Sequence, residues 1–326
     1  TRTVELARSQ ALQATSELQA GIDRGPLHGV PVSLKDLIEV ESVRTTGGSR
    51  LLKDNVSAAS ARVVKRLWGS GAVLLGKNTT YEFGLGLPQS GDWPEPAANP
   101  WDLHRIPGGS SSGSAAAVFA GLSFGAFGTD TGGSIRGPAA YCGVVGQKPS
   151  QGAISIDGVL PLSTTLDHVG PIARSVSDAR LLQVAVSEHD TASGHIDASL
   201  EGAVFGVPRH LIETAEFGPD VVESFEATVA AIEEQGAITK AIEYPDNGAT
   251  ERALLGIIGH EAYAVHRDAL SASGDLYGRS AYERLSGGSS VTQEEFEHAK
   301  RLAMMSKAHI DDVFTQVDWI LSPVTH

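Results

Sequence analysis

The chain has 326 residues, of which 41% are hydrophobic and 20% charged, so it is long enough to bury a core and has the composition of a folded protein. Its net charge of −14 offers no basic surface for phosphates, which disfavours nucleic acid and membranes as partners and favours a neutral or cationic small molecule. Cys142 is the only cysteine, which excludes an intrachain disulfide and a cysteine metal cage, and we expect a reducing, cytoplasmic location.

Strands and helices are predicted to alternate through the first half of the chain. Val30, Val32 and Leu34 are spaced as in a strand, and this strand ends at Lys35. An apolar run that begins near residue 115 is too short and too rich in glycine to cross a bilayer. The other elements predicted here are helices at 4–19 and 57–71, a buried strand at 72–78, a glycine and serine loop at 108–114 with an alanine-rich helix after it, and a second glycine loop at 131–134.

The second half continues this alternation. The runs AVFGVP, ITKAIEYP and WILSP are predicted as strands, with a helix near 219–235 and two longer helical stretches between them. Such alternation predicts a layered α/β fold with a mixed or largely parallel sheet. Residues 187–200 are polar and irregular, but we expect one domain over residues 1–326 rather than two independent ones.

A phosphate-binding loop is one alternative that the sequence suggests. Gly71, Gly76 and Lys77 match most of the GxxxxGK pattern. The match fails because Asn78 stands where Ser or Thr would hold magnesium, and because the intervening residues form the predicted strand itself. We therefore expect Lys77 to be an ordinary residue at a strand end. The 11 histidines show no metal-ligand spacing, so we expect neither a metal nor another cofactor.

A nucleophile elbow is a second alternative. Residues 109–113 read GSSSG and match the pattern GxSxG with Ser111 at its centre. An α/β-hydrolase would also need an acid and a histidine downstream. Asp167 and His168 are candidates, but they are adjacent in the chain and cannot line up in one triad. This pattern alone therefore does not make Ser111 the nucleophile.

The two glycine and serine loops are the best candidates for a reactive site. A flexible linker is not normally flanked on both sides by buried strands and helices, as these loops are predicted to be. Gly132 and Gly133 allow the backbone before Ser134 to turn its N–H groups toward one point at the start of a helix. An oxyanion hole requires this arrangement. Ser134 is therefore our candidate nucleophile.

Three linked motifs resemble the amidase signature family. PGGSSSGSAAAV at 107–118 is similar to the glycine and serine segment of that family, GTDTGGSIRGPAAYCGVVGQKP at 128–149 to its core, and GPLHGVPVSLKD at 25–36 to its lysine motif. The motifs occur in the family's order, and the resemblance covers essentially the whole chain. It implies an amidase-signature-like α/β fold, in which a mixed, largely parallel central β-sheet is covered by helices on both faces.

The resemblance also implies a reaction, the hydrolysis of a small-molecule carboxamide to a carboxylic acid and ammonia or an amine through a seryl acyl-enzyme. A neutral amine that acts through a second hydroxyl can activate a serine without histidine. The roles carried over are the catalytic lysine for Lys35, the bridging serine with a cis peptide for Ser110, and the nucleophile for Ser134. The backbone amides of Thr131, Gly132, Gly133 and Ser134 would form the oxyanion hole. Asp130 and Arg136 flank the nucleophile, and we expect them to order the loop by hydrogen bonds, with binding of a substrate carboxylate by Arg136 as the alternative.

A base effective near neutral pH requires a lysine whose pKa lies well below the usual value of about 10.4. Lys35 follows an apolar strand and precedes Leu37 and Ile38, so loss of water should disfavour its charged form. The carboxylate of Asp36 would raise the pKa if it faced the amine. We expect Asp36 to point away, as neighbouring strand residues do.

Other functions stay open. The glutamine-amidase subunit of a transfer-RNA-dependent amidotransferase shares all three motifs, although the acidic charge and the run PLSTTLDHVGP are closer to general amidases. A catalytically silent scaffold of the same fold is disfavoured because Lys35, Ser110 and Ser134 are all present. Family members usually have more chain at both ends, so we expect parts of the N- and C-terminal ends to be missing. The acyl group stays open, as does the oligomeric state, for which a homodimer is one alternative.

Overall fold

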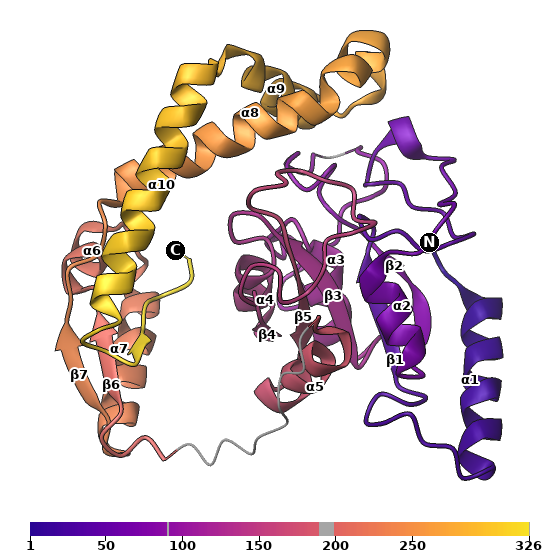
Figure 1. Cartoon of the computed structure of the whole chain (residues 1–326), viewed down its shortest axis with the longest axis horizontal. Helices are drawn as coiled ribbons and strands as arrows, with labels where there is room; N and C mark the ends of the chain where they lie inside the picture. The colour runs from indigo at the N-terminus through magenta and orange to yellow at the C-terminus, as the bar shows by residue number, and fades with distance from the viewer. Residues whose placement is uncertain (90, 189–198, 326) are drawn as a thin grey trace. The chain divides into compact units, whose positions relative to one another are not determined.

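The computed structural model describes residues 1–89, 91–188 and 199–325 (Figure 1). The chain divides into two compact units, one formed by residues 1–192 with 261–290 and the other by residues 193–260 with 291–326. Whether these two units form the single domain expected from the sequence stays a prediction. Within the described residues, no helix is both long and apolar enough to span a membrane.

A five-stranded sheet forms the centre of the first unit, with the strand order β2-β1-β3-β5-β4. β1 pairs in parallel with β2 and β3, whereas β5 runs antiparallel to both β3 and β4. All strands but β5 therefore share one direction, which confirms the mixed, largely parallel sheet predicted from the sequence. The strands are β1 (Pro31–Lys35), β2 (Val73–Asn78), β3 (Gly125–Asp130), β4 (Val145–Gly146) and β5 (His168–Ala173).

Successive strand residues face opposite sides of this sheet, where two separate apolar clusters form. Leu34 and Phe127 are register partners and lie in a cluster with residues of α2 and α5. Ala126, the neighbour of Phe127, lies in the second cluster with residues of α3 and α4. Helices therefore pack on both faces, as predicted. The helices of the first unit include α1 (Val4–Gln19), α2 (Arg62–Gly69), α3 (Ser112–Phe119), α4 (Arg136–Cys142), α5 (Val176–Val186) and α9 (Arg279–Gly287).

Helix α2 begins five residues later than the start predicted at residue 57. The backbone before it is extended because it pairs with an earlier segment. The N–H of Ser57 donates to the carbonyl of Val43 at 3.2 Å, and the N–H of Ala61 donates to the carbonyl of Glu39 at 2.9 Å. These hydrogen bonds satisfy backbone groups that a longer helix would have used internally.

The second unit contains a smaller parallel sheet with the order β7-β6-β8. Its apolar cluster joins Val207 of the sheet to Phe225 and Val229 of α7. Thr292 and Glu295 form a reciprocal capping box that fixes the start of α10. The remaining strands and helices are β6 (Val204–Val207), β7 (Ile238–Ala241), β8 (Trp319–Ile320), α6 (Arg209–Thr214), α7 (Pro219–Glu233), α8 (Asn247–Ser273), which runs through the boundary between the units, and α10 (Gln293–Val313).

Candidate active site

The predicted site residues meet at one edge of the five-stranded sheet. Because β1 and β3 are parallel, their carboxyl ends lie at the same edge, and these ends are Lys35 and Asp130. The loop before α3 reaches the loop after β3 at this edge, where the N–H of Ser111 donates to the carbonyl of Ser134 at 3.1 Å. Open α/β sheets commonly bind ligands outside the carboxyl ends of parallel strands.

Lys35 is completely buried, with 0% of its surface exposed. Its Nζ lies 2.6 Å from Ser110 Oγ, 2.7 Å from Thr129 Oγ1 and 3.4 Å from the carbonyl oxygen of Thr129. Burial lowers the pKa of Lys35 to about 7, although the charges of Asp130 and Asp167 act to raise it. The amine is therefore substantially neutral at physiological pH and can accept a proton from a neighbouring hydroxyl.

Ser110 is held rigidly beside this amine. The peptide bond between Gly109 and Ser110 is cis, the geometry that the family resemblance implied. The carbonyl of Ser110 accepts hydrogen bonds from Thr80 Oγ1 at 3.0 Å and from the N–H of Tyr81 at 3.2 Å. A Cβ atom on Gly109 would lie 2.2 Å from two atoms of the Tyr81 ring, so only glycine fits there.

The loop that carries Ser134 is organised by the carboxylate of Asp130. Its two oxygens accept hydrogen bonds from the N–H groups of Gly133 at 2.7 Å and Ile135 at 3.1 Å. Arg136 adds its Nε at 3.0 Å and its Nη2 at 2.9 Å. Burial acts to raise the pKa of Asp130, but the Arg136 guanidinium and these N–H groups outweigh it and lower the pKa to about 2.

One of the four amides expected in the oxyanion hole is engaged elsewhere. Gly133 donates its N–H to the buried Asp130 carboxylate, which is a strong acceptor. The amides of Thr131, Gly132 and Ser134 have no hydrogen-bond partner among the described residues. Among the described residues the N–H groups of these three amides are therefore unused, whereas that of Gly133 is not. Ser134 itself is partly buried.

Both alternatives suggested by the sequence are unsupported by the geometry. Ser111 is fully buried, and its hydroxyl oxygen lies within hydrogen-bond distance of the backbone N–H and carbonyl of Thr129. Lys77 is also buried, and its Nζ lies 3.0 Å from Asp36 Oδ1 and 2.9 Å from Thr45 Oγ1. Ser111 is thus a structural residue. Lys77 belongs to a buried ion pair rather than being an ordinary residue at a strand end.

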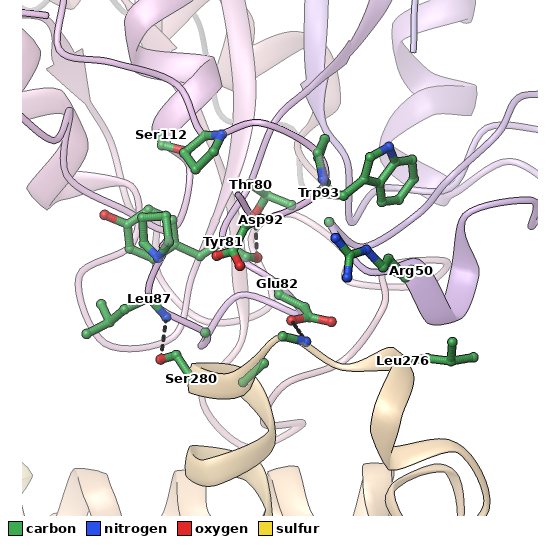
Figure 2. Close-up of a pocket in the computed structure, with 17 residues that line it drawn as sticks. Arg50, Thr80, Tyr81, Glu82, Leu87, Asp92, Trp93, Ser112, Leu276 and Ser280 are labelled. Atoms are coloured by element: carbon green, nitrogen blue, oxygen red, sulfur yellow. Dashed lines mark hydrogen bonds between the residues drawn. The ribbon is translucent and has the colours of Figure 1, made fainter. Parts of the chain in front are cut away.

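A pocket lies close to the Ser110 loop (Figure 2). Figure 2 shows the Glu82 side chain pointing toward the segment that precedes α9, where the N–H of Gly278 donates to Glu82 Oε2 at 2.8 Å. Burial raises the pKa of Glu82. Among its described lining residues the pocket includes Ser112 but not Lys35 or Ser134. It is therefore a neighbour of the candidate catalytic groups rather than the pocket that holds them.

A model of the Amidase family matches residues 1–326. The chain belongs to the amidase family. Its solved relatives include a crystal structure of an amidase with 34% sequence identity and a TM-score of 0.89, which covers 97% of this chain and 71% of that one. The native peptide amidase of Stenotrophomonas maltophilia is similar with 28% identity and a TM-score of 0.80, covering 98% of this chain and 75% of that one.

Curated relatives of this amidase-family chain carry a narrower name. A glutamyl-tRNA(Gln) amidotransferase subunit of Moorella thermoacetica is 41% identical over 266 residues, which cover 78% of this chain and 54% of that protein. The protein of the same name from Carboxydothermus hydrogenoformans is 38% identical, with 75% and 53% covered. The chain spans about half the length of these relatives.

Two residues of this amidase-family site were missed by the sequence reasoning. Thr129 contacts Lys35, and Asp167 accepts a hydrogen bond from Thr131 Oγ1 at 2.6 Å. Thr129 lies within the core motif, directly before Asp130, so the motif itself was the available signal. Asp167 was considered only as a partner of Ser111. Its contact with Thr131 depends on the pairing of β5 with β3, which no local pattern specifies.

Proposed function

We propose that this chain carries the catalytic centre of an amidohydrolase that cleaves a small-molecule carboxamide to a carboxylic acid and ammonia or an amine. The observation that carries the proposal is the buried contact of 2.6 Å between Lys35 Nζ and Ser110 Oγ, next to the loop of Ser134. A buried lysine with a pKa of about 7 matches the requirement for a general base near neutral pH.

In the proposed mechanism Ser134 Oγ attacks the carbonyl carbon of the amide. Its proton passes to Ser110, whose own proton passes to the neutral amine of Lys35. The amides of Thr131, Gly132 and Ser134 would stabilise the negative charge that forms on the carbonyl oxygen. The C–N bond then breaks as the proton returns through Ser110 to the leaving nitrogen. Water attacks the resulting ester and releases the acid.

Thr129 has a positioning role in this scheme. Its hydroxyl and carbonyl oxygens lie 2.7 Å and 3.4 Å from Lys35 Nζ and orient the amine. When the amine takes up a proton, these oxygens can accept hydrogen bonds from the ammonium. Hydrogen bonds to the charged form favour it, so they assist the transfer that activates Ser134.

A second candidate function is favoured by the curated relatives. Their name supports a role as the glutamine-amidase subunit of a transfer-RNA-dependent amidotransferase, in which the same site would release ammonia from glutamine. The chemistry at Ser134 would be unchanged, and the difference would lie in the substrate and in the need for a partner chain. The net charge of −14 disfavours direct binding of the RNA by this chain.

The test is a panel of primary amides, anilides and glutamine, with mass detection of the released acid. Hydrolysis without a partner supports the small-molecule amidase, whereas glutaminase activity that appears only with a partner protein supports the second candidate. A fluorophosphonate should modify Ser134, and Ser134→Ala should abolish both modification and turnover. Folded protein that shows neither labelling nor turnover would favour the silent scaffold.

A further inference from the structure

Asp167 is a buried carboxylate beside the candidate oxyanion-hole loop, with 8% of its surface exposed. One oxygen accepts the hydrogen bond from Thr131 Oγ1 at 2.6 Å. The other accepts the N–H groups of Leu162 at 2.9 Å and Ser163 at 3.0 Å. Donors therefore occupy both oxygens, which favours the ionised form although burial raises the pKa of Asp167.

The turn that precedes Asp167 is held by hydrogen bonds to a residue of another element, helix α8. Glu261 of α8 accepts hydrogen bonds from Ser163 Oγ at 2.5 Å and from the N–H of Thr165 at 3.1 Å. The hydroxyl of Thr165 donates to the second oxygen of Glu261. Thr131 is thus linked through Asp167 to a turn whose backbone is fixed at several points, and a rigid support of this kind is what a precisely placed loop requires.

Asp167 also differs from the other carboxylates near Lys35 in its charge environment. Asp130 is paired with the guanidinium of Arg136, and Asp36 is paired with Lys77. Within the described part of the chain, no lysine or arginine forms a salt bridge with Asp167. Its charge and that of Lys35 act on each other, so Asp167 stabilises the ammonium form of the lysine.

We propose that Asp167 is a positioning residue of the amidase reaction, which holds Thr131 and the oxyanion-hole loop in place and acts through its negative charge on the amine of Lys35. The inference rests on the proposed function, because it assigns Asp167 a part in the same reaction. Two separable effects follow. Loss of the hydrogen bond should lower kcat, and loss of the charge should move the pH dependence.

The test compares Asp167→Asn with Thr131→Val, using the pH profiles of kcat/KM on an amide and of the rate of fluorophosphonate modification. Removal of the carboxylate charge disfavours the Lys35 ammonium, so in Asp167→Asn the acid limb of both profiles should shift to lower pH by about one unit. Thr131→Val removes the hydroxyl and keeps the charge. It should lower kcat about tenfold with little change in KM and leave the acid limb where it is.

Asp157→Asn is the matched control, since it removes an exposed negative charge from the surface pocket that Asp157 and Asp167 both line, and it should leave both profiles unchanged. An unmoved acid limb in folded Asp167→Asn overturns the action on Lys35. An unchanged kcat in Thr131→Val overturns the positioning of the loop, and this variant decides that point even if Asp167→Asn does not fold. Wild-type protein that neither hydrolyses amides nor is modified at Ser134 would contradict the proposed function and this inference with it. If the wild type is active and both Asp167→Asn and Thr131→Val behave like it, the result contradicts this inference but not the proposed function.

Discussion

The side chains of Lys35 and Asp36, which are consecutive in the chain, end in two separate buried networks. Lys35 contacts Ser110 and Thr129, whereas Asp36 Oδ1 lies 3.0 Å from Lys77 Nζ. Asp36 therefore points away from the amine of Lys35, as the sequence predicted from the alternation of strand residues. Its charge is compensated by Lys77, and within the part of the chain that the structure describes no carboxylate forms a salt bridge with Lys35.

The Asp36–Lys77 pair gives the first prediction, which concerns stability. Lys77→Met leaves a buried carboxylate without its cation, and we expect it to lower the free energy of unfolding by about 3 to 5 kcal/mol. The double variant Asp36→Asn with Lys77→Met should cost less than Lys77→Met alone, because no buried charge is left unpaired. Urea denaturation at neutral pH measures both.

The exposed pair of Arg279 and Glu283 is the control for this experiment. Its side chains are largely in water, so Arg279→Met should change the free energy of unfolding far less than Lys77→Met does. Equal losses for Lys77→Met and Arg279→Met would contradict a structural role for the buried pair.

The second prediction concerns the pH dependence of stability. The pKa of Lys35 falls from 10.5 to about 7 in the folded protein, so between these values the unfolded chain binds more protons than the native protein does. The contribution of Lys35 to the free energy of unfolding therefore rises with pH above about 7 and levels off near pH 10.5, the pKa of the lysine in the unfolded chain. Lys35→Met lacks this dependence. It should be more stable than the wild type at pH 6 by about 2 kcal/mol or more.

Thermal denaturation across pH 6 to 10 checks this prediction. The difference in Tm between Lys35→Met and the wild type should shrink as the pH rises, since the lysine becomes neutral in both states. A difference that does not change with pH would mean that the native protein keeps Lys35 as an ammonium.

The third prediction concerns turnover. Lys35→Arg should lose essentially all amide hydrolysis, because a guanidinium does not release its proton in this pH range. Labelling of Ser134 should fall in parallel. Lys53→Arg, a substitution of the same kind at an exposed position, should behave as the wild type. Wild-type turnover in Lys35→Arg would remove the general-base role and leave the lysine as an electrostatic support.

The sequence predicted those parts of the fold and site that depend on local pattern. The alternation before Lys35 predicted its position at a strand end. The motifs identified two loops, which the structure connects by the hydrogen bond from the N–H of Ser111 to the carbonyl of Ser134. The late start of α2 could not be predicted, since it depends on the pairing of residues 57–61 with residues 39–43. The position of Asp167 was also beyond reach, because its side chain meets Thr131 only through the antiparallel pairing of β3 and β5.

The fourth prediction tests the packing beneath Ser110. Gly109→Ala would place a methyl group 2.2 Å from atoms of the Tyr81 ring, which cannot be accommodated without moving the ring or the loop. We expect the free energy of unfolding to fall by about 1 to 3 kcal/mol. We also expect kcat to fall, because the loop that carries Ser110 would be displaced. Gly69→Ala is the control, because nothing lies within 4 Å of the Cβ that it adds. If Gly109→Ala and Gly69→Ala have equal Tm and kcat, the close packing on Tyr81 does not hold the loop.

The fifth prediction concerns Asp130, whose carboxylate holds the loop of Ser134. Its pKa of about 2 lies below the unfolded value of 3.8, so the group contributes stability that is fully present above about pH 4 and is lost as the pH falls toward 2. Asp130→Asn should therefore be less stable than the wild type at pH 7 by about 2 kcal/mol, which corresponds to that shift. The difference should narrow steadily between pH 4 and pH 2, where the wild-type carboxylate takes up a proton.

Turnover should respond to Asp130→Asn more strongly than stability does. An amide group in place of the carboxylate cannot accept the N–H groups of Gly133 and Ile135 together with the guanidinium of Arg136, because one of its two ends is a donor. The loop then loses the contacts that orient the amides beside Ser134, and kcat should fall about 100-fold, within the range found when oxyanion stabilisation is lost. Arg136→Lys keeps a positive charge next to Asp130 and should have a smaller effect. Full turnover in folded Asp130→Asn would mean that the loop keeps its conformation without the carboxylate. Contacts other than those of Asp130 would then orient the amides of Thr131, Gly132 and Ser134.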